Sequence, residues 1–187
     1  MARVSDVPPE AVPPDVRGTY VTFSTAYGAF RDQVGVMAHV PPAVKGLMGM
    51  LLDLRERQNV PFRYIELAIV VVAKLNECHY CVDHHKPLLI VEGLSETGVG
   101  RLLEFADHPE LDEVDKLVVE YAIVVTQSPQ RVSDRLFTRL REHFTESQVV
   151  EITLRTALCG FFNRFNDALQ IGTETESLAL AQRLAAG

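Results

Sequence analysis

An apolar stripe near the C-terminal end constrains the fold of this chain most strongly. Thr145, with Gln148 three residues later, has the pattern of a capping box, in which two residues satisfy each other's backbone N–H groups at a helix N-terminus. Apolar side chains then recur at helical spacing at Leu154, Leu158, Phe161, Phe165 and Leu169. Because so broad an apolar face has to be covered, the pattern predicts a long helix within a helical bundle.

The chain before this helix also divides into helices separated by helix breakers. Pro41 and Pro42 separate one helical stretch from the next, which runs to about Gln58. A helix is expected over residues 62–76, although its β-branched run would also suit a strand. The length of the segment and the presence of Glu66 on it favour the helix.

Capping residues mark further helix boundaries. A helix from near Cys78 should end at Gly93, and Pro87 inside it predicts a kink or an early end. Three candidate N-caps precede helices that end near residues 105, 126 and 143: Ser95, Asp112 and Ser133. We therefore predict an all-α fold, with an extended proline-rich leader over residues 1–18 and a single-domain helical bundle over residues 19–187. A last amphipathic stretch is expected over residues 178–185.

Charge and apolar patterning exclude several classes of protein. The net charge of −7 argues against nucleic-acid and anionic-membrane partners, which are bound by basic faces. The longest apolar run, residues 67–73, is too short to span a bilayer. The N-terminal residues lack the apolar stretch of a secretory signal, so we expect a cytoplasmic protein.

Two of the three cysteines, Cys78 and Cys81, form a C-x-x-C pair. In a reducing compartment such a pair usually does redox work or binds a metal. His85 lies four residues after Cys81, so on one helix the two side chains share a face and can exchange a proton. A turn at residues 76–77 would bring Glu66 back toward the pair. The free amides at a helix start would favour a thiolate on Cys78.

Four residues together form the pattern E-x11-C-x-x-C-x-x-x-H: Glu66, Cys78, Cys81 and His85. This pattern resembles that of the alkylhydroperoxidase D and carboxymuconolactone decarboxylase family, and the likeness extends to residues 76–81 and 163–166. Tyr80 departs from the best-known peroxidase form, which has a histidine before the second cysteine. The resemblance implies an all-helical fold and assembly as a homotrimer or hexamer.

The resemblance also implies a thiol-dependent alkyl hydroperoxidase activity. In the peroxidase branch the second cysteine attacks the hydroperoxide and the first resolves the sulfenic acid as a disulfide. Cys81 would then be the attacking and Cys78 the resolving residue, with Glu66 and His85 as the proton relay. The reductant would be a dithiol partner such as a lipoyl protein or a peroxiredoxin. We expect no organic cofactor, because the chain has no flavin or nicotinamide motif.

Other interpretations stay open at this point. A lyase of the decarboxylase branch would not need the cysteine pair. A metal-binding or interaction protein could use the pair as zinc ligands, but closed zinc sites usually have two such clusters and only one is visible, so we expect no metal. We interpret Cys159 as a small core residue and expect His84 and His108 to face solvent.

Overall fold

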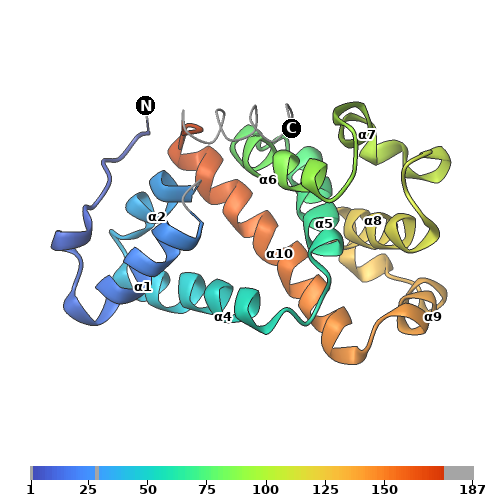
Figure 1. Cartoon of the computed structure of the whole chain (residues 1–187), viewed down its shortest axis with the longest axis horizontal. Helices are drawn as coiled ribbons and strands as arrows, with labels where there is room; N and C mark the ends of the chain where they lie inside the picture. Colours follow the sequence, from blue (N-terminus) through green and yellow to red (C-terminus); the bar gives the residue numbers. More distant parts are fainter. Residues whose placement is uncertain (1, 28–29, 175–187) are drawn as a thin grey trace.

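The computed structural model describes residues 2–27 and 30–174, and within these ranges every regular element is helical (Figure 1). The α-helices are α1 (Pro14–Ala26), α2 (Arg31–Met37), α3 (Pro41–Ala43), α4 (Gly49–Arg57), α5 (Phe62–Leu75), α6 (His79–Val91), α7 (Glu96–Gly100), α8 (Glu113–Gln127), α9 (Asp134–His143) and α10 (Glu146–Leu169). Shorter 3-10 or π-helical turns are η1 (Pro9–Ala11), η3 (Val44–Met48), η4 (Leu102–Asp107) and η5 (Pro129–Arg131). The all-α prediction is confirmed.

No helix of the described ranges has both the length and the apolar character needed to cross a bilayer. The amphipathic stretch expected at 178–185 lies outside the described residues.

The long helix α10 crosses the middle of the molecule. Figure 1 shows it in orange, between the N-terminal helices α1, α2 and α4 and the group formed by α5, α8 and α9. The helix starts with the predicted capping box. Thr145 Oγ1 accepts a hydrogen bond from the backbone N–H of Gln148 at 3.3 Å, and Gln148 Oε1 accepts one from the backbone N–H of Thr145 at 2.9 Å. The predicted apolar stripe is not the buried face, because Leu154 and Phe161 are 38% and 46% exposed.

The buried face of α10 is instead mixed in polarity. It consists of Val149, Glu151, Ile152, Thr156, Cys159, Gly160, Phe162, Asn163 and Asn166. Helical spacing reveals that apolar residues share a face, but which face is buried depends on the polar partners that the neighbouring helices offer. Here the buried amides of α10 have hydrogen-bond partners on neighbouring helices, and the apolar stripe is left partly exposed.

Two apolar clusters form the core. The first lies among α5, α8, α9 and α10, and α5 is buried without interruption from Ile65 to Ala73. The second joins the N-terminal helices to α6 and α10, and it contains Phe23, Met48 and both cysteines of the pair. Both α5 and α10 contribute to the two clusters, since Ala73 and Phe162 belong to the second while Val70 and Ile152 belong to the first.

The N-terminal segment joins the core earlier than expected. Helix α1 begins at Pro14, so residues 14–18 are helical and not extended as we predicted. A proline is compatible with the first turn of a helix, where its missing N–H would have no intrahelical acceptor. Val12 and Val16 are buried against the second cluster, and the Tyr20 hydroxyl donates to the Val7 carbonyl at 3.1 Å.

The chain reverses between α5 and α6 through a tight helix C-cap. The Cys78 N–H donates to the Ala73 carbonyl at 3.0 Å and the Glu77 N–H to the Lys74 carbonyl at 3.2 Å, which is the hydrogen-bond pattern of a Schellman motif. Glu77 takes the left-handed conformation (φ 56°) that this motif requires. The predicted turn therefore exists. Pro87 does not end α6, which continues to Val91 and stops before Gly93 (φ 98°) as expected.

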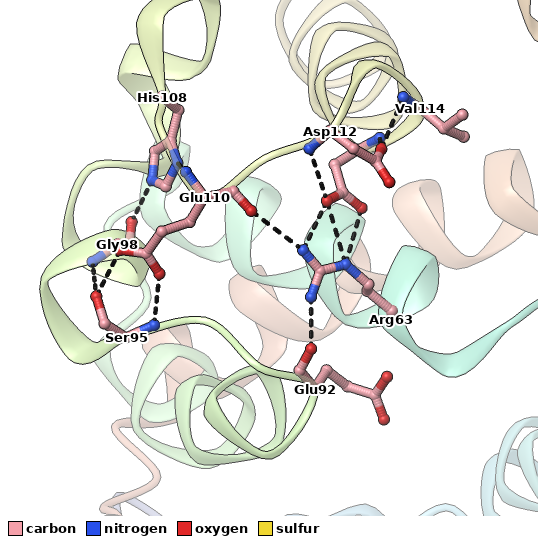
Figure 2. Close-up of polar contacts among 9 residues, drawn as sticks. Arg63, Glu92, Ser95, Gly98, His108, Glu110, Asp112 and Val114 are labelled. Atoms are coloured by element: carbon pink, nitrogen blue, oxygen red, sulfur yellow. Dashed lines mark hydrogen bonds and ion pairs between the residues drawn. The ribbon is translucent and has the colours of Figure 1, made fainter.

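A polar network fixes the start of α5 (Figure 2). Arg63 binds Asp115 through Nε at 2.9 Å and Nη2 at 2.6 Å, and its Nη1 donates to the Glu92 carbonyl. Asp115 is also part of the capping box of α8 with Asp112. Arg63 thus ties α5 to the end of α6 and the start of α8, three residues before Glu66.

The same figure includes His108, which is buried and not solvent-exposed as we expected. Its Nδ1 accepts from the Glu110 N–H at 3.2 Å and its Nε2 lies 2.9 Å from the Gly98 carbonyl oxygen. Glu110 in turn accepts two hydrogen bonds from Ser95, at 2.7 Å from the backbone N–H and 2.6 Å from the hydroxyl. These contacts join α7 to the segment that leads into α8.

Candidate active site

A cavity of about 710 Å³ lies between α1, α4, α5, α6 and α10. Its volume is within the usual range of small-molecule sites. Most of its lining is apolar, with side chains such as Phe23, Phe30, Leu54, Ile65 and Phe162. Three of the four residues predicted from the sequence pattern line it: Glu66, Cys81 and His85.

The fourth predicted residue, Cys78, lies directly behind Cys81. It occupies the N-cap position of α6, and Cys81 lies in the first turn, so the two sulfurs are 3.3 Å apart. Both side chains are buried, at 0% and 3% exposure. A disulfide bond is about 2.05 Å long, so only a small shift of the side chains separates this dithiol from the bonded pair.

Hydrogen bonding distinguishes the two sulfurs. The Cys78 thiol donates to Cys81 Sγ, and this hydrogen bond, together with burial, raises the pKa of Cys78 well above its usual range. Cys81 Sγ also accepts from Asn166 Nδ2 at 3.4 Å. The Asn166 Oδ1 in turn accepts from Gln33 Nε2 at 2.9 Å. Cys81 Sγ thus accepts two hydrogen bonds and lines the cavity, whereas the Cys78 thiol is a donor, in contrast to the helix-start argument that favoured Cys78 as the reactive sulfur.

Neither Gln33 nor Asn166 was predicted as a site residue. Both are buried, and they come from α2 and from the end of α10. Asn166 lies in the segment 163–166 that took part in the family resemblance, and this was the only signal in the sequence that could have identified it. Gln33 has no comparable signal.

Glu66 and His85 form a direct pair across α5 and α6. Glu66 Oε2 lies 2.7 Å from His85 Nδ1, with the carboxylate 2% and the imidazole 17% exposed. The antiparallel arrangement of the two helices therefore brings Glu66 toward the cysteine helix, as the predicted turn required. The pair can move a proton between the cavity and a buried carboxylate, which is the arrangement of a general acid–base group with an orienting partner.

His84 is buried against a carboxylate and does not face solvent as we expected. Its Nε2 lies 2.6 Å from Glu174 Oε2, and its Nδ1 contacts the Tyr80 carbonyl oxygen. Both ring nitrogens therefore lie against oxygens of other residues, which fixes the orientation of the imidazole. Glu174 was not predicted as a site residue; it lies beyond the end of α10 and reaches back to α6.

Glu174 also binds Tyr80 and the start of α2. The Tyr80 hydroxyl donates to Glu174 Oε1 at 3.0 Å, as does the Asp32 N–H at 2.9 Å. Burial raises the pKa of Glu174, but the hydrogen bonds from His84 and Asp32 outweigh it and keep this pKa below its ordinary value of 4.5. Burial and the charge of Glu174 raise the pKa of Tyr80, so Tyr80 acts as a neutral hydrogen-bond donor.

Cys159 is a buried residue of α10 whose thiol donates to the Ile69 carbonyl at 3.5 Å. Burial raises its pKa to about 12, which makes it a poor nucleophile at neutral pH. Among the described residues, no group of three or more His, Cys, Asp or Glu side chains is placed to hold a metal ion.

This chain resembles known proteins both in sequence and in fold. Residues 41–107 match the carboxymuconolactone decarboxylase family. The uncharacterized protein YnjA of Escherichia coli (strain K12) is 29% identical over 136 residues, which cover 70% of this chain and 72% of that protein. A peroxidase-related protein from Ralstonia eutropha JMP134, described as an alkylhydroperoxidase AhpD core, has a TM-score of 0.82 at 19% identity and covers 97% of both chains. The debrominase Bmp8 in complex with 2,3,4-tribromopyrrole has a TM-score of 0.76 at 18% identity, covering 97% of this chain and 96% of that one.

Proposed function

Because the resemblance to the alkylhydroperoxidase D and carboxymuconolactone decarboxylase family is confirmed, we propose that this chain is a peroxidase-type oxidoreductase that reduces organic hydroperoxides with a dithiol pair. The observation that carries this proposal is the environment of Cys81. Its sulfur lines the cavity, lies 3.3 Å from that of Cys78 and accepts hydrogen bonds from Cys78 and Asn166. The cavity also contains the Glu66–His85 pair as a source of protons.

The first step is attack of the Cys81 thiolate on the terminal oxygen of the hydroperoxide. The O–O bond breaks, the sulfur takes this oxygen as a sulfenic acid, and the remaining alkoxide leaves as an alcohol. His85 supplies the proton to the leaving oxygen, and Glu66 orients and recharges the imidazole. The substrate is reduced by two electrons, and Cys81 is oxidised by the same number.

The second step resolves the sulfenic acid. Cys78 loses its proton and attacks the Cys81 sulfur, which releases water and forms the disulfide. The hydrogen bond between the two sulfurs already aligns them for this step. An external dithiol then reduces the disulfide by thiol–disulfide exchange. We propose a lipoyl protein or a peroxiredoxin as this donor, and the cytoplasm as a compartment that keeps the pair reduced.

The proposal is tested by adding cumene hydroperoxide to the reduced protein. We expect one equivalent of hydroperoxide to be consumed and two thiols to be lost, with a disulfide between Cys78 and Cys81 in the peptide map. Cys81→Ser should abolish the consumption. Cys78→Ser should leave a sulfenic acid on Cys81 that a dimedone-type probe traps. Cys159→Ser is the matched control and should react like the parent protein.

Substitutions in the Glu66–His85 pair test the relay. Glu66→Gln and His85→Ala should slow consumption by roughly 10²–10⁴-fold, the usual contribution of general acid–base catalysis. Hydroperoxide consumption that survives Cys81→Ser would contradict the proposed reaction. Absence of consumption in the parent protein would favour a lyase reaction at the same cavity, for which the cysteine pair is not needed.

We also propose that the chain assembles as a homotrimer or hexamer. One face of α10 carries exposed apolar side chains at Val150, Leu154 and Phe161, which fall on the same side of the helix. Exposed apolar groups of this kind are typical of interfaces when they are contiguous. Light scattering should give a trimer or hexamer, and Phe161→Glu should shift it toward the monomer. A monomeric parent protein would contradict this assembly.

A further inference from the structure

Two arginines line the cavity and converge on one tyrosine. Arg55 comes from α4 and Arg155 from α10. The guanidinium carbon of Arg55 lies 4.7 Å from the centre of the Tyr27 ring. Burial raises the pKa of the Tyr27 hydroxyl, and the charges and hydrogen bonds of both guanidinium groups act against this rise, so both cations lie near the same hydroxyl.

Neither arginine has a carboxylate partner in the part of the chain that the structure describes. Arg55 donates to the Ala26 carbonyl, and the buried Nε of Arg155 has no hydrogen-bond partner. Glu151 lines the cavity one turn before Arg155, but its carboxylate accepts from Asn59 Nδ2 at 3.0 Å and no ion pair joins it to Arg155. Buried polar groups without a partner are rare in folded proteins, so this N–H of Arg155 is available to donate to a group bound in the cavity.

Arg155 lies far from the reactive sulfur along α10. Asn166, which contacts Cys81, follows Arg155 by eleven residues on this helix, or roughly 16 Å at 1.5 Å per residue. Between these two levels the helix presents Leu158 and Phe162 to the cavity. The cavity therefore has a thiol at one end, a guanidinium pair toward the other and an apolar wall between them.

From this arrangement we propose that the substrate is a long-chain hydroperoxide that carries a carboxylate, such as a fatty-acid hydroperoxide. The carboxylate would bind Arg155 and Arg55, since a guanidinium offers two parallel N–H donors that match a carboxylate. The alkyl chain would lie along the apolar wall and place the O–O bond at Cys81. The inference rests on the proposed function, because it takes the reacting group to be a hydroperoxide. The carboxylate itself is unchanged in the reaction.

Binding can be measured without turnover. Dodecanoate and dodecanol have the same chain and lack a hydroperoxide, so their dissociation constants for the reduced protein can be compared by calorimetry. Dodecanoate should bind about tenfold or more tightly than dodecanol, which is the value of one charge-assisted hydrogen bond. Arg155→Gln should remove this preference and leave dodecanol binding unchanged. Arg155→Lys should keep part of it.

The matched control is Arg57→Gln. Arg57 lies on the same helix as Arg55, donates to the Ser147 hydroxyl and does not line the cavity, so its replacement should leave both dissociation constants unchanged. Arg55→Gln should weaken dodecanoate binding as Arg155→Gln does. Equal binding of dodecanoate and dodecanol, or a preference that survives both cavity substitutions, would overturn the carboxylate site.

Turnover then tests the substrate class. The kcat/KM for linoleic acid hydroperoxide should exceed that for its methyl ester by about tenfold, and Arg155→Gln should lower it for the acid alone, mainly through KM. Turnover of acid and ester at equal kcat/KM would overturn the inference while the peroxidase function stands. Failure to consume either compound, together with arginine-dependent dodecanoate binding, would overturn the proposed function and support the carboxylate site.

Discussion

Replacing Asn166 with alanine should slow the reaction of Cys81 with electrophiles by about tenfold at neutral pH. The Asn166 amide donates to Cys81 Sγ at 3.4 Å, and the Gln33 amide behind it polarises this donor. A hydrogen bond to a charged group contributes about 1.5–3 kcal/mol, and the long N···S distance places this one at the lower end. Loss of about 1.5 kcal/mol of stabilisation of the attacking sulfur in the transition state slows the reaction about tenfold.

The substitution also has a predictable effect on folding stability. With Asn166 truncated, the buried Nε2 of Gln33 loses its acceptor, which costs about 1–3 kcal/mol of unfolding free energy. Chemical denaturation should therefore accompany the reactivity measurement and establish that the variant is folded. Asn166→Asp should slow the reaction further, because a carboxylate would repel the neighbouring thiolate.

The assay is alkylation by iodoacetamide under pseudo-first-order conditions, with the Cys81 peptide quantified by mass spectrometry. Asn163→Ala is the matched control, since this buried amide lies one turn earlier on α10 and contacts Asn76 and Cys159 instead. An unchanged Cys81 rate in folded Asn166→Ala would refute the role of the donor chain. Equal slowing by Asn163→Ala would show that general disturbance of α10 is the cause.

Three further outcomes are expected. Gly98→Ala should lower the thermal midpoint, because its Cβ would lie 2.6 Å from the Glu110 carboxylate and displace it from its hydrogen bonds, whereas Gly100→Ala, with nothing within 4 Å, should not. The folded-state pKa of Glu174 is lowered, so the stability that its carboxylate contributes should be complete above about pH 4.5. This contribution should be lost as the pH falls through the folded-state pKa. In unfolding curves measured over a pH series, Glu174→Gln should show a smaller decrease in stability at acid pH. Cys159, with its pKa of about 12, should resist alkylation at neutral pH in the folded protein and react after denaturation.

Local signals predicted the helices well. Ser95, Asp112, Ser133 and Thr145 all cap the helices that they were expected to begin, because a cap involves residues two or three positions apart in the sequence. The pairing of Glu66 with the cysteine helix could also be anticipated, since it needed one chain reversal. The helix boundaries and the predicted members of the site follow from such short-range relations.

Burial and long-range partners could not be predicted in this way. His84 and His108 were expected in solvent, but each is buried because an acceptor from another segment satisfies it. The carboxylate that binds His84 is 90 residues away in sequence, and Gln33 lies 133 residues from Asn166. A single sequence contains no record of such pairs, and polar residues on a helix then look like solvent-facing ones.

The position of Cys81 in front of Cys78 has a consequence for kinetics. Of the pair, Cys81 alone lines the cavity, so in the proposed reaction the oxidant and the reductant must reach the same sulfur through the same space. The two cannot be bound together, and the protein has to release one product before it accepts the other reactant. Initial rates of the proposed reaction should therefore follow a ping-pong pattern. Each reactant in excess should inhibit, because it would occupy the cavity of the redox form that reacts with the other reactant. Of the two donors that we propose, the lipoyl protein therefore fits this space better, because its dithiol is carried on a slender arm that can enter the cavity.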